Sequence, residues 1–261
     1  MWLRQFEAWR TAKAYDLNND KLIREFANNL YEKGKAYSSI KVGCSWAKRY
    51  LNWLGEFQPV AVQRPFEIPK MYSQDMYCPD DSAVNGIINS RNSIGLPYGY
   101  AISLLAYTGM RDSEIINIKY NEWEIGNNRN IVLHLSTTKN GRPRDVPLLK
   151  SGEWLFKEYV TKVRPGLIGT NESQWLFPQQ KHHDKPILRK NVEYYMRDLR
   201  KELNNDKLTC HSLRRYYVTK LMANNIPEAT VAKLIGHSNM RNFGRYYKPT
   251  ADHLSEALGD L

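Results

Sequence analysis

Five short segments bring together arginine, lysine, histidine and tyrosine side chains, the residue types suited to chemistry at a phosphate. They are TGMRDSE at 108–114, TKNG at 138–141, HSLRR at 211–215, LIGHS at 234–238 and RYY at 245–247. Taken singly, each has an ordinary structural explanation as a helix cap, a solvated charge or a packed ring. Their combination and their order along the chain favour chemistry at a phosphodiester.

Each residue type in this set has a part that it could play in such a reaction. The planar guanidinium of arginine binds two phosphate oxygens at once and keeps its charge at any physiological pH. Preorganised cations stabilise the extra negative charge of a pentacoordinate phosphorus without a metal ion. A tyrosine hydroxyl can attack phosphorus and form a covalent phosphoester. The departing 5′-oxygen then needs a proton, which a nearby lysine or histidine could donate.

The composition agrees with a polyanionic partner. Among 261 residues, 38 are Lys or Arg and 27 are Asp or Glu, which gives a net charge of +11. This surplus of positive charge favours nucleic acid as the partner.

The sequence also argues against a membrane or secreted protein. No stretch reaches the ~20 apolar residues of a membrane-spanning helix. Charges interrupt the N-terminus, which argues against a signal peptide. Cys44, Cys78 and Cys210 are odd in number and lack CxxC spacing, which argues against a disulfide framework or a structural zinc site. We expect a cytoplasmic protein with reduced thiols.

The elements that must position these residues divide the chain into two parts. Residues 1–57 show apolar positions at helical spacing, which predicts a small all-helical domain whose second helix is capped by Asn18 or Asn19. Residues 58–79 contain four prolines and no sustained period, as expected for an extended linker. Residues 80–261 form a second, larger domain of mixed pattern.

In the larger domain, residues 131–135 alternate in a strand pattern and are followed by Asn140-Gly141 and a second apolar run at 146–148. This arrangement is a strong β-hairpin signal. Helical periods predict the other elements of this domain at 80–91, 97–107, 112–118, 151–161, 189–203, 211–224 and 227–235.

The ordered set of segments resembles the tyrosine recombinases of the phage integrase and chromosome-dimer-resolving group. That family has the pattern TGxRxxE, a lysine on a β-hairpin, HxLRR, LxGH and a tyrosine nine residues later. The matching residues in this chain are Arg111 with Glu114, Lys139, His211 with Arg214, His237 and Tyr246. The resemblance implies a mainly α fold with a small antiparallel β-sheet (α+β). It also implies a helical core-DNA-binding domain at 1–57, a linker at 58–79 and a catalytic domain at 80–261.

The resemblance also implies a role for each matched residue. Arg111 and Arg214 clamp the scissile phosphate, and Lys139 protonates the departing 5′-oxygen. His211 assists proton transfer at the tyrosine, and His237 donates a hydrogen bond to a phosphate oxygen.

The nucleophile implied by the resemblance is Tyr246, which would form a 3′-phosphotyrosine on the way to a Holliday junction. Tyr247 lies directly beside it, and on a helix the two side chains point about 100° apart, so that only one can face the arginines. The spacing from His237 favours Tyr246. No metal ion, ATP or other cofactor is implied, because the phosphotyrosine stores the bond energy.

The implied partners are double-stranded DNA with specific recombination sites and three further copies of the chain, forming a homo-tetramer on paired sites. The tail provides a candidate contact between copies, because one helical stripe contains Leu254, Ala257, Leu258 and Leu261. A helix this short needs a docking surface. That surface is either a neighbouring copy or the tail's own domain.

Two other functions remain as alternatives. Residues 226–241 resemble the helix-turn-helix of a repressor, which would bind DNA without cutting it. A type IB topoisomerase uses a similar residue set to nick and reseal one duplex. The full catalytic set argues against a repressor, and the separate helical domain with an apolar tail favours a recombinase over a topoisomerase.

Overall fold

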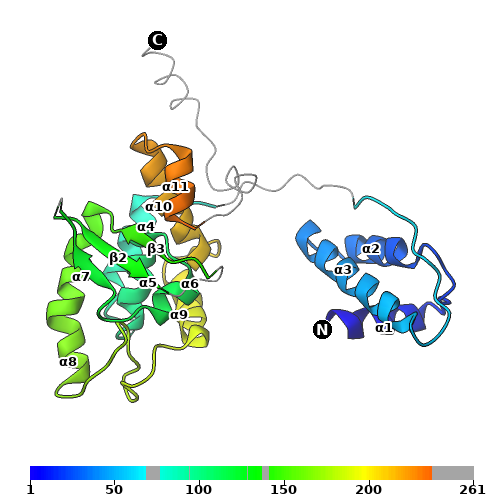
Figure 1. Cartoon of the computed structure of the whole chain (residues 1–261), viewed down its shortest axis with the longest axis horizontal. Helices are drawn as coiled ribbons and strands as arrows, with labels where there is room; N and C mark the ends of the chain where they lie inside the picture. The colour runs from blue at the N-terminus through cyan, green and yellow to red at the C-terminus, as the bar shows by residue number, and fades with distance from the viewer. Residues whose placement is uncertain (69–76, 94, 128, 137–140, 237–261) are drawn as a thin grey trace, which may run out of the picture. The chain divides into compact units, whose positions relative to one another are not determined.

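The computed structural model divides into two compact units, Met1–Gln74 and Asp75–Leu261 (Figure 1). The division falls within the proline-rich segment 58–79. The residues that the structure describes are 1–68, 77–93, 95–127, 129–136 and 141–236.

The smaller unit consists of helices packed around aromatic rings. Its helices are α1 (Trp2–Ala12), α2 (Leu22–Glu32) and α3 (Tyr37–Leu54). The rings of Phe6 and Phe26 meet edge to face with centroids 5.0 Å apart, a favoured aromatic geometry. The sequence places the cap of α2 too early: Lys21 is the N-cap residue, and the side chain of Asn19 accepts a hydrogen bond from the Lys21 amide at 2.9 Å.

The first part of the proline-rich segment is extended and attached to the smaller unit. Val60, Phe66 and Ile68 pack against the aromatic core. The Gln63 side chain accepts from the Ile23 amide at 3.0 Å, which pairs one of the amides at the start of α2 that lack a partner within the helix. Residues 60–68 therefore belong structurally to the helical unit.

The larger unit is mainly α-helical with a small antiparallel sheet, which confirms the predicted fold class. Its elements are α4 (Asp81–Asn89), α5 (Tyr98–Thr108), α6 (Asp112–Asn117), β1 (Trp123–Ile125), β2 (Ile131–Leu135), β3 (Arg144–Pro147), α7 (Glu153–Glu158), α8 (Arg164–Ile168), α9 (Arg189–Glu202), α10 (Cys210–Ala223) and α11 (Glu228–Leu234). The periods along the sequence predict most of these helices to within two residues. The helix predicted at 151–161 instead continues to Ile168, through a π-helical turn at Tyr159–Val163.

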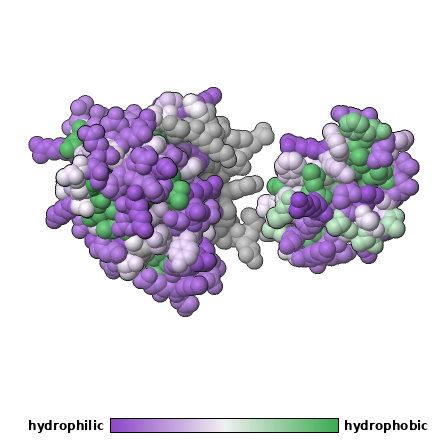
Figure 2. All heavy atoms as spheres, turned by 90° about the horizontal axis from the view of Figure 1, so that it is seen from below, coloured by the Kyte–Doolittle hydropathy of each residue, from purple (hydrophilic) through white to green (hydrophobic). Residues whose placement is uncertain are grey.

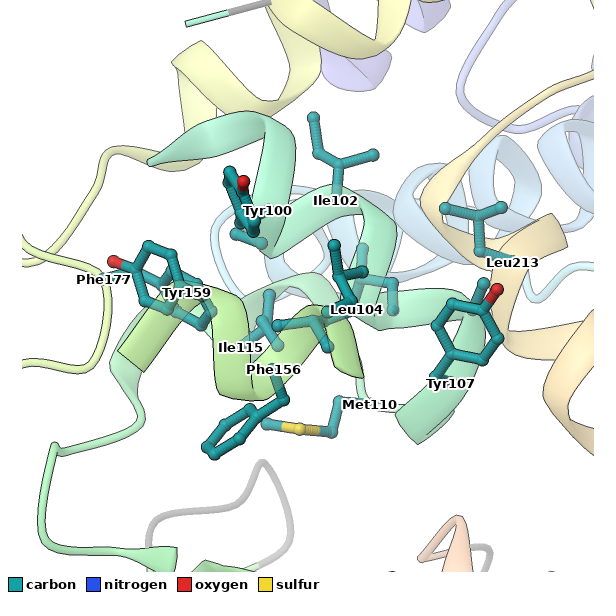
Figure 3. Close-up of a cluster of buried hydrophobic side chains, with 14 of the residues drawn as sticks. Tyr100, Ile102, Leu104, Tyr107, Met110, Ile115, Phe156, Tyr159, Phe177 and Leu213 are labelled. Carbon is teal, nitrogen blue, oxygen red and sulfur yellow. The ribbon is translucent and has the colours of Figure 1, made fainter. Parts of the chain in front are cut away.

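Helix α5 forms the centre of this unit, and every one of its residues is buried. It is apolar all round, as expected for a helix enclosed by others, and it packs against α4, α7, α9 and α10. Figure 3 shows Tyr100 and Leu104 of this helix among the surrounding core side chains. In the same core the rings of Tyr159 and Phe177 stack with centroids 4.7 Å apart.

The sheet has the order β1-β2-β3, with each neighbouring pair antiparallel. On β2 the buried residues Ile131, Leu133 and Leu135 alternate with half-buried ones, which is the pattern of a strand with one face on the core. Leu133 is opposite Val146 and Leu135 is opposite Arg144, so that Arg144 lies on the core face of β3. Strand β1, which the sequence did not predict, completes the outer edge.

Figure 2 shows a mostly hydrophilic surface on the larger unit, with isolated hydrophobic residues between. Among the helices of the described residues, none has both the length and the apolar character that a membrane crossing needs.

Candidate active site

A glycine turn at the end of α5 brings the first predicted arginine into the site. Gly109 has φ of +59°, and a Cβ there would lie 2.3 Å from the Tyr217 ring. Both the left-handed conformation and the close approach require glycine. The chain then reverses, and Arg111 becomes the N-cap residue of α6, where its amide donates to Glu114 Oε2 at 2.8 Å.

Glu114 is a buried carboxylate shared between two arginines. Its side chain is 1 % exposed. Arg111 Nη1 donates to Oε1 at 2.7 Å, and Arg144 donates through Nη1 to Oε1 at 2.9 Å and through Nη2 to Oε2 at 2.7 Å. Burial alone would raise the pKa of Glu114, but the hydrogen bonds and charges of Arg144 and Arg111 outweigh it and lower the pKa to about 2. Glu114 is therefore ionised at neutral pH and holds both guanidinium groups.

The second predicted arginine lies on α10, whose start is fixed by a reciprocal cap. The Ser212 amide donates to Thr209 Oγ1 at 3.0 Å, and the Thr209 amide donates to Ser212 Oγ at 2.9 Å. Arg214 lies one turn into this helix and is buried. Its Nη1 donates to the Gly109 carbonyl at 2.6 Å, and its Nη2 donates to the Ile235 carbonyl. Arg214 thus connects the turn before Arg111 to the end of α11.

The end of α11 collects arginine side chains from three other elements. Arg144 Nε donates to the Leu234 carbonyl at 2.8 Å, Arg214 Nη2 donates to the Ile235 carbonyl, and Arg111 Nη2 donates to the Gly236 carbonyl at 3.1 Å. The last carbonyls of a helix lack partners within the helix and carry partial negative charge. These three successive carbonyls therefore anchor three guanidinium groups side by side.

His211 lies in the first turn of α10, exposed at the surface. Partial desolvation lowers its pKa, and the positive charges of Arg215, Arg214 and Arg111 lower it further, with a smaller opposing effect from Asp112. A lowered pKa keeps the imidazole neutral at neutral pH, so that one ring nitrogen can accept a proton.

The structure thus brings together Arg111, Arg214 and His211 of the predicted site. Lys139, His237 and Tyr246 lie outside the described residues, as do Tyr247 and the tail. The described chain ends at Gly236, directly before His237, and strands β2 and β3 flank the segment that contains Lys139.

Arg144 was not among the residues predicted from the sequence. A signal was present, because Arg144 is two residues before the buried Val146 on a strand and period-two alternation places both on the core face. A charged residue on a core face needs a buried partner, and the nearby TGxRxxE segment contains the acid that provides it. Within the described part of the chain, no three His, Cys, Asp or Glu side chains gather in a group that could hold a metal ion.

Comparison with known proteins assigns the chain to a family. Residues 80–253 match the model of the phage integrase family. The chain therefore belongs to the phage integrase family and is a tyrosine-type site-specific DNA recombinase. This finding confirms the resemblance seen in the sequence and decides against the repressor interpretation of residues 226–241.

Similar proteins cover most of the chain. The tyrosine recombinase XerC of Staphylococcus saprophyticus is 25% identical over 262 residues, which cover 97% of this chain and 85% of that protein. The tyrosine recombinase XerA of Pyrococcus furiosus is 25% identical over 236 residues, covering 89% of this chain and 77% of that protein.

The fold is also shared with solved structures. The XerH recombinase bound to palindromic difH substrate in a post-cleavage complex has a TM-score of 0.70 and 16% identity, covering 98% of this chain and 75% of that one. The Tn1549 transposon integrase with circular intermediate DNA has a TM-score of 0.69 and 18% identity, covering 95% and 87%.

Proposed function

We propose that this recombinase breaks and rejoins DNA strands through a 3′-phosphotyrosine on Tyr246 and a Holliday junction. The observation that carries the proposal is the placement of Arg111 and Arg214. Their guanidinium groups bind the carbonyls of adjacent residues, Gly236 and Ile235. Adjacent residues are only about 3.8 Å apart, so the two cations converge on a region comparable in size to one phosphate group.

In the proposed reaction, the Tyr246 oxygen attacks phosphorus while His211 accepts the phenolic proton. The bond from phosphorus to the 5′-oxygen breaks, and Lys139 donates a proton to that oxygen. Arg111, Arg214 and His237 donate hydrogen bonds to the other phosphate oxygens, where negative charge increases in the transition state. The 5′-hydroxyl of a partner strand then attacks the phosphotyrosine and gives its proton to Lys139, while the phosphorus–tyrosine bond breaks and Tyr246 regains its proton from His211. This sequence needs no metal ion and no ATP.

The smaller unit has a surface suited to the DNA backbone. Lys41, Lys48 and Arg49 are exposed along α3, and the Arg49 guanidinium lies 5.6 Å from the centroid of the exposed Trp46 ring. Lysine and arginine contacts to phosphates give binding that weakens with salt. We propose that this face contacts DNA as part of a core-binding domain, and that four copies assemble on paired sites in the cytoplasm.

Replacement of Tyr246 tests the proposed chemistry. The substrate is a pool of duplexes with a randomised core and nicks at different positions in that core. Where a nick lies beside the cleavage point, the short cleaved end diffuses away and the covalent complex accumulates. The wild-type chain should form a complex that survives a denaturing gel, and Tyr246→Phe should form none while binding the same DNA. Tyr247→Phe is the matched control and should retain the covalent complex. If Tyr247→Phe forms no covalent complex and Tyr246→Phe does, the nucleophile is Tyr247. If the wild-type chain forms no covalent complex, the phosphotyrosine mechanism is refuted.

A further inference from the structure

Arg144 is a charged residue on the buried face of a strand. It is opposite the buried Leu135 in the β2–β3 register, and its side chain is only 10 % exposed. Ordering and burying a guanidinium group is costly unless it is paired and hydrogen-bonded. Arg144 meets both conditions, through a two-point contact with Glu114 and a bond from Nε to the Leu234 carbonyl at 2.8 Å.

These contacts join three segments that are far apart in the sequence. Arg144 begins β3, the second strand of the hairpin whose connecting segment contains Lys139. Glu114 lies in α6, whose N-cap residue is Arg111. Leu234 is the last residue of α11, and the next two carbonyls bind Arg214 and Arg111. A single side chain therefore connects the hairpin, the first arginine and the end of α11.

The chain makes room for this side chain at Gly236. A Cβ at that position would lie 3.0 Å from Arg144 Nη1 and 3.1 Å from its Cζ. Gly236 also has φ of +65°, which strains other residues. The Arg144 guanidinium therefore packs directly against the turn at Gly236.

We propose that Arg144 is a positioning residue that fixes the orientation of the Arg111 guanidinium through Glu114 and the end of α11. This inference rests on the proposed function. Arg111 binds Glu114 Oε1 and the Gly236 carbonyl. Arg144 holds the first of these acceptors directly, and it holds the second through the Leu234 carbonyl, two residues before Gly236 in the same turn. Arg144 itself needs no contact with DNA.

Arg144 and Arg111 both lower the pKa of Glu114. When Arg144 is replaced, Arg111 is the one of the two that remains. Among the residues that the structure describes, the charged groups that pair with Glu114 are Arg144 from β3 and Arg111 from the start of α6. Helix α9 also packs against α6, but its Arg189 pairs with Asp112 instead. Without Arg144, burial is opposed by Arg111 and no longer by Arg144, so the pKa of Glu114 rises. Cleavage should then weaken at acidic pH, as Glu114 is protonated and releases Arg111.

The test uses the full chain with Arg144→Met and Arg144→Lys, and measures single-turnover cleavage of the nicked DNA from pH 5.5 to 8. We expect Arg144→Met to cleave roughly 30-fold more slowly at pH 7.5, less than the 10²–10³ of a direct donor. Its rate should fall more steeply than the wild-type rate toward the acidic end of this range, because protonation of Glu114 then adds to that of His211. Arg144→Lys should recover part of the rate, because lysine keeps the charge but not the two-point geometry. DNA affinity should change less than about threefold, since uniform binding is not affected.

Arg164→Met is the matched control. Arg164 is also buried, donates to the Ser173 and Trp175 carbonyls, and stacks over Tyr120 at 3.8 Å. Its loss should lower the melting temperature without changing the shape of the pH profile. Equal cleavage rates and pH profiles for Arg144→Met and Arg164→Met would overturn the positioning role.

If Arg144→Met does not fold, the same comparison is made with Arg144→Lys, for which a wild-type rate and pH profile would also overturn the proposal. A wild-type chain that forms no covalent complex instead contradicts the proposed function, so the two failures are distinguishable.

Discussion

Replacing Glu114 with glutamine removes the carboxylate that Arg111 and Arg144 share and keeps the shape of the side chain. In the folded protein the pKa of Glu114 is lowered from 4.5 to about 2. Each pKa unit corresponds to about 1.4 kcal/mol, so ionised Glu114 stabilises the fold by about 3 kcal/mol at neutral pH. This magnitude agrees with the roughly 3–5 kcal/mol measured when one partner of a buried ion pair is removed.

The sign of the pH dependence follows from the direction of the shift. Because the folded-state pKa is the lower one, the stabilisation is complete above the unfolded value of 4.5 and is lost as pH falls toward 2. Glutamine resembles the protonated acid, so the difference in unfolding free energy between wild type and Glu114→Gln should be about 3 kcal/mol at pH 7. That difference should shrink steadily below pH 4.5.

The assay is urea unfolding of the full chain at a series of pH values, followed by far-ultraviolet circular dichroism. We expect one transition for each unit, and the change should be confined to the transition of the larger unit, which contains Glu114. Glu193→Gln is the control, because Glu193 is 65% exposed and lies 3.5 Å from Arg189 on the surface of α9; such pairs contribute little. A difference between wild type and Glu114→Gln that stays constant from pH 7 to pH 3 would refute the reasoning.

Two further substitutions test the turn before Arg111 and the proton donor. Gly109→Ala should lower the melting temperature of the larger unit by several degrees, because the new Cβ would lie 2.3 Å from the Tyr217 ring at a φ of +59°; an unchanged transition in a thermal scan would contradict this. Lys139→Ala should lose cleavage of ordinary DNA but recover it on a substrate with a 5′-thio leaving group, which needs little protonation. Failure of the sulfur substrate to restore cleavage would remove Lys139 from the role of general acid.

Much of the fold could be predicted because local signals and tertiary packing agree. Helix α9 was expected at 189–203 and spans Arg189–Glu202, because its apolar residues recur on one face that then packs on α5. Asn140-Gly141 and alternating apolar residues located the two hairpin strands. Strand β1 was not predicted from the sequence. Its three residues, Trp123–Ile125, are too few to establish a period, and the strand is specified by its pairing with β2.

The candidate site was predictable in its residue types but not in its connections. The sequence identifies Arg111 and Arg214 through their motifs, yet it does not show that both donate to carbonyls at the end of α11. Such contacts depend on segments more than 20 residues apart, and no local propensity encodes them. The strand pattern marks Arg144 as a charge on a core face, but it does not identify the partners, because Glu114 and Leu234 lie 30 and 90 residues away along the chain.

The choice of acceptors for these arginines has an electrostatic consequence for phosphate binding. A carboxylate paired one-to-one with each arginine would neutralise the charge that a phosphate needs. Here Glu114 is shared, so that the group formed with Arg111 and Arg144 keeps a net positive charge. Arg214 is oriented through the neutral carbonyls of Gly109 and Ile235, which accept hydrogen bonds without cancelling charge. The arrangement thus fixes guanidinium geometry largely through neutral or shared acceptors, which is the preorganisation that favours a transition state with extra negative charge.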